Sequence, residues 1–192
     1  MDTFTAFAGQ TRIAAGPLPK VALVLKHAAP STEPIVIFND RTGQPIDIDL
    51  RGSDREILAR LPVDAGVVAD QPPTGPRGRG RGRPKLGVVA REVTLLPQHW
   101  DWLNAQPGGA SVALRKLVHE ARRANGDSDR AREARDAAYH FMSGIGSNLP
   151  QFEEASRALF AGDLGRFAGL IADWPADIRD HAVALAHRHR AE

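Results

Sequence analysis

The chain has 192 residues, a formal net charge of +2 and 42% hydrophobic residues, which is typical of a globular protein. It contains no cysteine, which excludes disulfides, zinc–thiolate sites and thiol nucleophiles. No secretory signal opens the chain, and its most apolar stretch, residues 21–25, is too short to cross a bilayer, so we expect a cytoplasmic protein without a membrane contact.

Residues 1–61 predict a small α+β domain. Residues 45–50 alternate between apolar and acidic side chains, which predicts a half-buried strand paired with the apolar run 34–38 across a turn at Gly43. The aspartates of this strand, Asp47 and Asp49, then form its polar face and are not a catalytic pair. The other expected elements are two short strands at 3–9 and 10–15, a helix at 18–28, and a helix capped by Ser53 or Asp54 that ends at Leu61.

Charge is distributed unevenly along the chain. Residues 1–70 have a net charge of −2, residues 71–124 of +7, and residues 125–192 of −3. A basic segment between two acidic flanks indicates a localised site for a polyanion, since an ordinary solvated surface mixes its signs.

The linker predicted at 62–87 is rich in proline and glycine and predicts no buried core. Its residues 77–85, RGRGRGRPK, are called the basic arm below. The run from Arg81 to Pro84 resembles the AT-hook, whose core is Arg-Gly-Arg-Pro, and this resemblance implies binding to A·T-rich duplex DNA. The narrow A·T minor groove attracts arginines, and glycine lets the backbone lie deep in it. The expected DNA contacts come from Arg77, Arg79, Arg81, Gly82, Arg83, Pro84 and Lys85.

Two other interpretations of the basic arm stay open. Arg-Gly runs also occur in RNA-binding tails, where they stack on bases without specificity. The arm is otherwise a plain solubilising linker whose arginines contact nothing. Against the plain linker, six basic residues lie between Asp70 and Glu92 with no carboxylate among them, a pattern that phosphate neutralisation favours.

Residues 88–124 predict a strand at 88–96, a short helix at 98–104 after Pro97, and a longer helix with Ser111 as its N-cap. This order resembles the ribbon-helix-helix repressors of the Arc and MetJ type, in which strands of two chains pair into a ribbon. The resemblance implies a homodimer, since an isolated strand cannot satisfy its own backbone. Arg91 and Ser111 would add phosphate contacts. The expected dimer core consists of Leu95, Leu114, Leu117 and Val118.

The strand departs from the ribbon-helix-helix pattern on its groove-facing side. Val93 and Leu95 share a face, which leaves Glu92, Thr94 and Leu96 on the other, a poor set for reading bases. The ribbon would then recognise few DNA bases, or it would serve only to join two chains into a dimer. The alternative interpretation of residues 88–124 is a helical hairpin that packs under Trp100 and Trp102 and does not bind DNA.

Residues 125–192 predict a helical region. One helix is expected at 129–145 and three shorter ones after it, separated at Gly162 and Pro175. These helices offer a surface for a protein partner. The order of arm, strand and two helices, together with FEEASRALFAG (152–162) and WPADIRDHA (174–182), resembles a bacterial protein family of unknown function. That resemblance implies no particular activity.

No constellation in the chain predicts catalysis, a metal site or a cofactor. The C-terminal histidines His181, His187 and His189 lie near Asp177 and Asp180, but their mutual spacing is not that of helical metal ligands. No glycine-rich segment matches a nucleotide-binding fingerprint.

These observations predict an α+β fold with four consecutive segments, 1–61, 62–87, 88–124 and 125–192. They favour a non-enzymatic DNA-binding protein of the nucleoid, either a transcription regulator or an architectural protein, that acts as a homodimer. The alternative is an antitoxin-like interaction protein in which the basic arm is only a linker. An RNA-binding protein and an enzyme are less favoured.

Overall fold

The computed structural model describes residues 2–29, 31–62, 89 and 91–188. Its backbone contacts divide the chain into two compact units, one formed by 1–67 together with 126–192 and the other by 68–125. The fold is α+β, as the sequence predicts. Within the described residues, no helix has both the length and the apolar character needed to cross a membrane.

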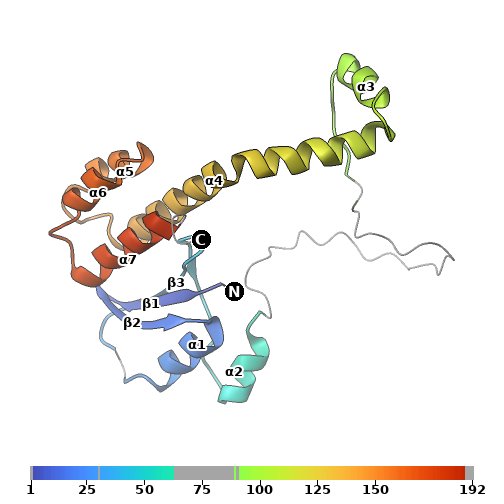
Figure 1. The fold of residues 1–192 in the computed structure, drawn as a ribbon. Coiled ribbons are helices and arrows are strands. Elements are labelled where there is room, and N and C mark those ends of the chain that lie inside the picture. Colours follow the sequence, from blue (N-terminus) through green and yellow to red (C-terminus); the bar gives the residue numbers. More distant parts are fainter. Residues whose placement is uncertain (1, 30, 63–88, 90, 189–192) are drawn as a thin grey trace. The chain divides into compact units, whose positions relative to one another are not determined.

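The first unit contains an antiparallel sheet with the strand order β2-β1-β3-β4 (Figure 1). The strands are β1 (Phe4–Ala8), β2 (Thr11–Gly16), β3 (Ile35–Asn39) and β4 (Pro45–Ile46). The predicted hairpin is confirmed, with Ile37 opposite Ile46 in its register. The strand expected at 45–50 is wrong in its length, because the backbone N–H of Arg51 donates to Asp49 and the chain turns away from β3.

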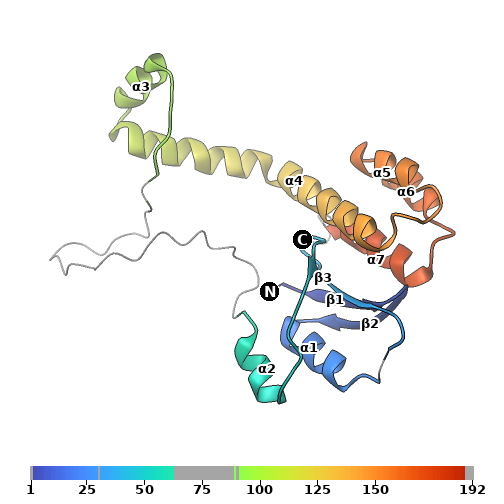
Figure 2. The ribbon, with the colours of Figure 1, turned by 180° about the vertical axis from the view of Figure 1, so that it is seen from behind.

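Both faces of this sheet are covered, because successive side chains of a strand point to opposite sides. Phe4 and Ala6 of β1 belong to a core with α1 (Leu18–His27) and α2 (Asp54–Arg60). Phe7 faces the other way and belongs to a second core with helices from the C-terminal part of the chain. Figure 2 shows the sheet from behind, with α1 and α7 on opposite sides of it.

The helix α2 begins where the sequence predicts. Ser53 is its N-cap and accepts a hydrogen bond from the backbone N–H of Glu56, while the Glu56 side chain accepts one from the backbone N–H of Ser53. This capping box satisfies two N–H groups that a helix end otherwise leaves unpaired.

The second core joins the sheet to the last part of the chain. Phe7 and Phe38 from the sheet pack with Phe141 of α4 (Gly109–Ile145), Phe167 and Trp174. The helices that complete this core are α5 (Phe152–Phe160), α6 (Leu164–Leu170) and α7 (Ala176–His187), which confirm the three short helices predicted there. The first and last segments that the sequence separates therefore share one hydrophobic core.

The helix α4 is continuous over 37 residues, so the two helices expected around a break near residues 124–128 are wrong. Gly126 lies inside it, and a single glycine costs only about 1 kcal/mol in a helix interior. Arg130 pairs with Asp127, and Arg132 pairs with Asp129 at 2.9 Å. Such pairs three residues apart stabilise a helix locally, and they span the expected break.

The described part of the second unit is helical. It contains α3 (Pro97–Asn104) and the first half of α4. The strand expected at 88–96 is wrong for this single chain, since residues 91–96 have no strand partner in the part of the chain that the structure describes. A strand needs a neighbour for its N–H and C=O groups, and the described residues supply none there; the expected ribbon would take its second strand from another copy of the chain.

Candidate nucleic-acid interface

The expected DNA contacts fall into two groups in the structure. Arg77, Arg79, Arg81, Gly82, Arg83, Pro84 and Lys85 of the basic arm lie outside the described residues. Arg91 and Ser111 are described, and both are exposed in the second unit. The structure therefore gives the geometry of the segment that follows the arm.

The turn between α3 and α4 is made by glycines. Gly108 and Gly109 have φ angles of 88° and 73°, in the left-handed region that favours glycine. Because this pair reverses the chain, α4 begins at Gly109. Ser111 therefore lies within the first turn of α4, and its predicted role as N-cap is wrong.

The buried part of this helical hairpin is small. Leu103 of α3 is 3% exposed and Ala113 of α4 is 7% exposed. Trp100 is half-buried, whereas Trp102 is 53% exposed and does not close a core. The hairpin thus buries few apolar side chains of its own.

The residues expected in the dimer core are only partly covered by the described residues. Leu117 is 42% exposed and Val118 is 56% exposed, while Leu95 and Leu114 are half-buried. Together with Ala121, the three α4 residues of this set recur at three- and four-residue spacing along one side of the helix. We call Leu114, Leu117, Val118 and Ala121 the apolar face of α4.

A second face of α4 carries the basic side chains. At 100° per residue, these positions lie about opposite the apolar face. No functional motif in the sequence marks these positions, although their helical spacing is visible in it. The set, called the basic face of α4, consists of Arg115, Lys116, His119, Arg122 and Arg123, and every member is exposed.

A different polar cluster lies in the core of the first unit. Nε2 of His181 on α7 is 3.4 Å from Oδ1 of Asp40, which follows β3, and the two side chains are only 8% and 14% exposed. The rings of Phe7 and Phe141 pack on the imidazole with centroid distances of 5.6 and 4.6 Å. Sequence spacing gave no sign of this pairing, since its two members are far apart along the chain.

The carboxylate of Asp40 is held in its charged form. Burial by itself raises the pKa of Asp40, but the contact with His181 and hydrogen bonds from Thr3 and Thr5 outweigh it, so the pKa is lowered. Neither Nε2 of His181 nor Oδ1 of Asp40 forms a hydrogen bond of good geometry among the described residues, so their 3.4 Å contact is a long polar contact. Aromatic and threonine neighbours enclose the pair, which favours a structural role.

The turn between β3 and β4, which contains Asp40, also contacts two other side chains. Nη1 of Arg188 donates to the backbone carbonyl of Asp40 at 2.7 Å, and Nδ1 of His140 on α4 lies 3.0 Å from the carbonyl oxygen of Thr42. These contacts join the turn between β3 and β4 to two helices. Within the described residues, no group of three or more His, Cys, Asp or Glu side chains has an arrangement that suits a metal ion.

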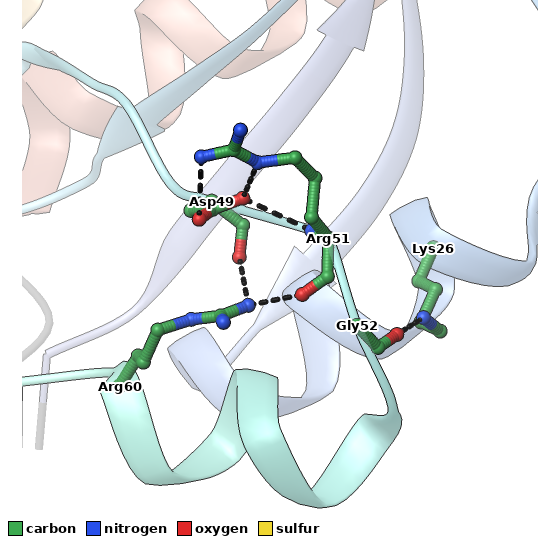
Figure 3. A network of polar contacts seen from close by, with 5 residues as sticks. All are labelled: Lys26, Asp49, Arg51, Gly52 and Arg60. Carbon is green, nitrogen blue, oxygen red and sulfur yellow. Dashed lines mark hydrogen bonds and ion pairs between the residues drawn. The ribbon is translucent and has the colours of Figure 1, made fainter.

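A third polar network follows β4 on the surface (Figure 3). Asp49 accepts from Nε of Arg51 at 2.8 Å and from its Nη2 at 3.0 Å, and these bonds hold the pKa of Asp49 far below its usual range. Arg60 donates to the backbone carbonyls of Asp49 and Arg51, and Lys26 donates to that of Gly52. The network ties α2 to the preceding loop, and Asp47 beside it is exposed. This geometry gives Asp49 a structural role, and Asp47 is an exposed polar residue of the same segment.

The comparison with known proteins finds one match over nearly the whole chain. A family model described as an uncharacterized protein conserved in bacteria (DUF2239) matches residues 3–186. This match confirms the resemblance to a bacterial family noted from the sequence. No curated protein and no solved structure matches the chain.

Proposed function

The chain belongs to the bacterial family DUF2239, and from its charge pattern we propose that it binds duplex DNA through the basic arm at residues 77–85. The observation that carries the proposal is the run Arg81-Gly82-Arg83-Pro84 inside a segment of net charge +7 between two acidic flanks. Arginine side chains are drawn into the narrow, strongly negative minor groove of A·T-rich DNA. Glycine and proline suit an extended backbone that follows the groove.

The described residues beside the arm support this proposal by their charge. Arg91 is exposed a few residues after the arm, where it would contact a phosphate. The basic face of α4 adds exposed cationic side chains in the same unit. In contrast, the first unit carries ion pairs such as Arg41–Asp2 and Arg157–Glu154, which reduce its attraction for a polyanion.

The proposal includes a homodimer formed through the apolar face of α4. Leu117 and Val118 expose 42% and 56% of their surface in the single chain, and a second copy would bury them along with Leu95 and Leu114. Pairing would also give residues 91–96 a second strand, as in a ribbon. A dimer carries two basic arms, and joining two weak sites raises the overall affinity through effective concentration. The role would then be that of a transcription regulator or an architectural protein of the nucleoid.

The test measures binding to A·T-rich and G·C-rich duplexes of equal length by fluorescence anisotropy, over a series of salt concentrations. Four or five phosphate or groove contacts predict a slope of roughly −4 for log affinity against log salt. The variant Arg81→Ala/Arg83→Ala should lose about 2 kcal/mol or more on the A·T-rich duplex. Arg130→Ala/Arg132→Ala is the matched control, because it removes two arginines that already pair with Asp127 and Asp129.

Two outcomes would contradict the proposal. Equal affinity for both duplexes excludes recognition of the A·T minor groove. Unchanged affinity in Arg81→Ala/Arg83→Ala removes the basic arm from the mechanism, whichever duplex is bound.

A further inference from the structure

The basic face of α4 concentrates positive charge on one side of a regular helix. Its members at 115, 116, 119, 122 and 123 fall within about a third of the helix circumference at 100° per residue. All five side chains are exposed. The helix itself therefore fixes their spacing.

Among the described residues, this charge is not compensated by ion pairs, although Glu120 lies on the same stretch of the helix. In the described ranges, Arg115, Lys116, Arg122 and Arg123 form no ion pair with a carboxylate. Farther along the same helix, Arg130 and Arg132 each pair with an aspartate three residues earlier. Arg115, Arg122 and Arg123 thus differ from Arg130 and Arg132, because among the described residues no carboxylate pairs with them and they are exposed to an external anion.

The length of the face suits a phosphate backbone. From Arg115 to Arg122 the helix rises about 10 Å, at ~1.5 Å per residue. Neighbouring phosphates of one B-DNA strand are about 3.4 Å apart along the duplex axis and farther apart along the winding strand itself, so the face is long enough to reach two of them. A row of cations of this length can therefore neutralise more than one phosphate of the same strand.

The apolar face of α4 points the other way. The centres of the two faces are about 150° apart on the helix, although Val118 lies next to Arg122, so a partner packed on Leu114 and Leu117 leaves most of the basic side chains open. Binding on one face is therefore compatible with pairing on the other.

We infer that the basic face of α4 is a second DNA-binding surface, which holds the phosphate backbone of the duplex whose groove the basic arm enters. The inference rests on the proposed function and deepens it. The arm supplies the preference for A·T-rich DNA, and the helix supplies affinity independent of sequence, because phosphate contacts carry no base information.

The experiment compares two charge-matched variants of the full chain, Arg122→Gln/Arg123→Gln and Arg130→Gln/Arg132→Gln. Glutamine is a good helix former, so the circular dichroism of both should equal that of the wild type. The first variant should make the salt slope shallower by about 2, since each phosphate contact contributes ~0.9. Its affinity should fall roughly tenfold on A·T-rich and G·C-rich duplexes alike, with an unchanged ratio between them. The second variant should retain the wild-type slope.

The outcomes separate this inference from the proposed function. If Arg122→Gln/Arg123→Gln keeps the wild-type slope while Arg81→Ala/Arg83→Ala loses affinity, the helix surface is refuted and DNA binding by the arm stands. An equal loss of slope in both glutamine variants also refutes it, because the effect is then one of net charge. Tighter binding to single-stranded RNA, with the same loss on substitution, assigns the surface to RNA instead. If the wild type binds neither duplex, the proposed function fails and this inference fails with it.

Discussion

Nε2 of His181 lies 3.4 Å from Oδ1 of Asp40, and this contact joins α7 to the turn between β3 and β4. Both side chains are largely buried, among the rings of Phe7 and Phe141. The N-terminal sheet and the C-terminal helix therefore meet at a polar pair inside an apolar core. A buried polar contact of this kind is costly to break, because each partner keeps its desolvation penalty.

Replacement of Asp40 by asparagine should lower the free energy of unfolding at pH 7 by about 2 kcal/mol. Because the folded-state pKa of Asp40 is lowered, its ionised form stabilises the fold above the unfolded value of 3.8. This stabilisation is lost as the pH falls from 3.8 through the folded-state pKa, so the difference between wild type and variant should shrink there. Urea unfolding of the wild type and the variant, at pH 7 and at lower pH, measures this difference in the free energy of unfolding.

The control for this prediction is Asp173→Asn, at an exposed aspartate of the same unit. It should leave the stability unchanged at both pH values. If the wild type and Asp40→Asn differ by the same amount at every pH, the ionised state of Asp40 contributes nothing to the fold.

Gly43 should not tolerate a side chain. Its φ is 67°, and a Cβ at this position would overlap the carbonyl oxygen of Ala137 on α4. We expect Gly43→Ala to destabilise the protein by about 3 kcal/mol or more in thermal unfolding, because backbone strain and displacement of the turn from α4 add up.

Gly109→Ala provides the matched comparison for Gly43. Gly109 has a φ of 73°, but a Cβ there meets no atom within 4 Å. We expect Gly109→Ala to destabilise the protein by only about 1 kcal/mol, because the left-handed backbone conformation is then the sole source of strain. Equal losses for the two variants would mean that the close approach of the turn to α4 adds nothing.

Leu117→Asp should weaken self-association without unfolding the chain. Leu117 is 42% exposed in the single chain, so a charge there meets water unless a second copy covers it. Analytical ultracentrifugation at micromolar concentration should show a dimer for the wild type and a monomer for the variant. Leu58→Asp, at a leucine 41% exposed on α2, should stay dimeric. A monomeric wild type would contradict the proposed homodimer.

Arg81→Lys/Arg83→Lys should retain the salt slope of DNA binding but reduce the preference for A·T-rich duplex. Lysine keeps the charge, yet its ammonium group is more strongly hydrated than a guanidinium, so its insertion into a narrow groove costs more. Anisotropy on the two duplexes, each over a salt series, separates the two effects. A retained preference would show that positive charge alone is sufficient in the arm.

Much of the local structure of this protein could be predicted from its amino-acid sequence. The alternation at 45–50 and the apolar run 34–38 predicted the hairpin, and Ser53 with Glu56 predicted the start of α2. Pro97 likewise marked the start of α3. Periodicity, capping and proline geometry act between residues close in the chain, so they can be read without the fold. The basic arm was equally visible, because charge density is a property of composition.

How distant segments combine could not be predicted, because it depends on packing in three dimensions. The sharing of one core by the sheet and the C-terminal helices, and the pairing of Asp40 with His181, depend on side chains brought together by packing. The continuity of α4 through Gly126 was missed for a different reason: the penalty of one glycine is small beside the contributions of a long helix, so a glycine alone does not predict a break. The exposure of Leu117 and of the basic face of α4 could not be predicted either, because a periodic pattern names the side of a helix but not what covers it.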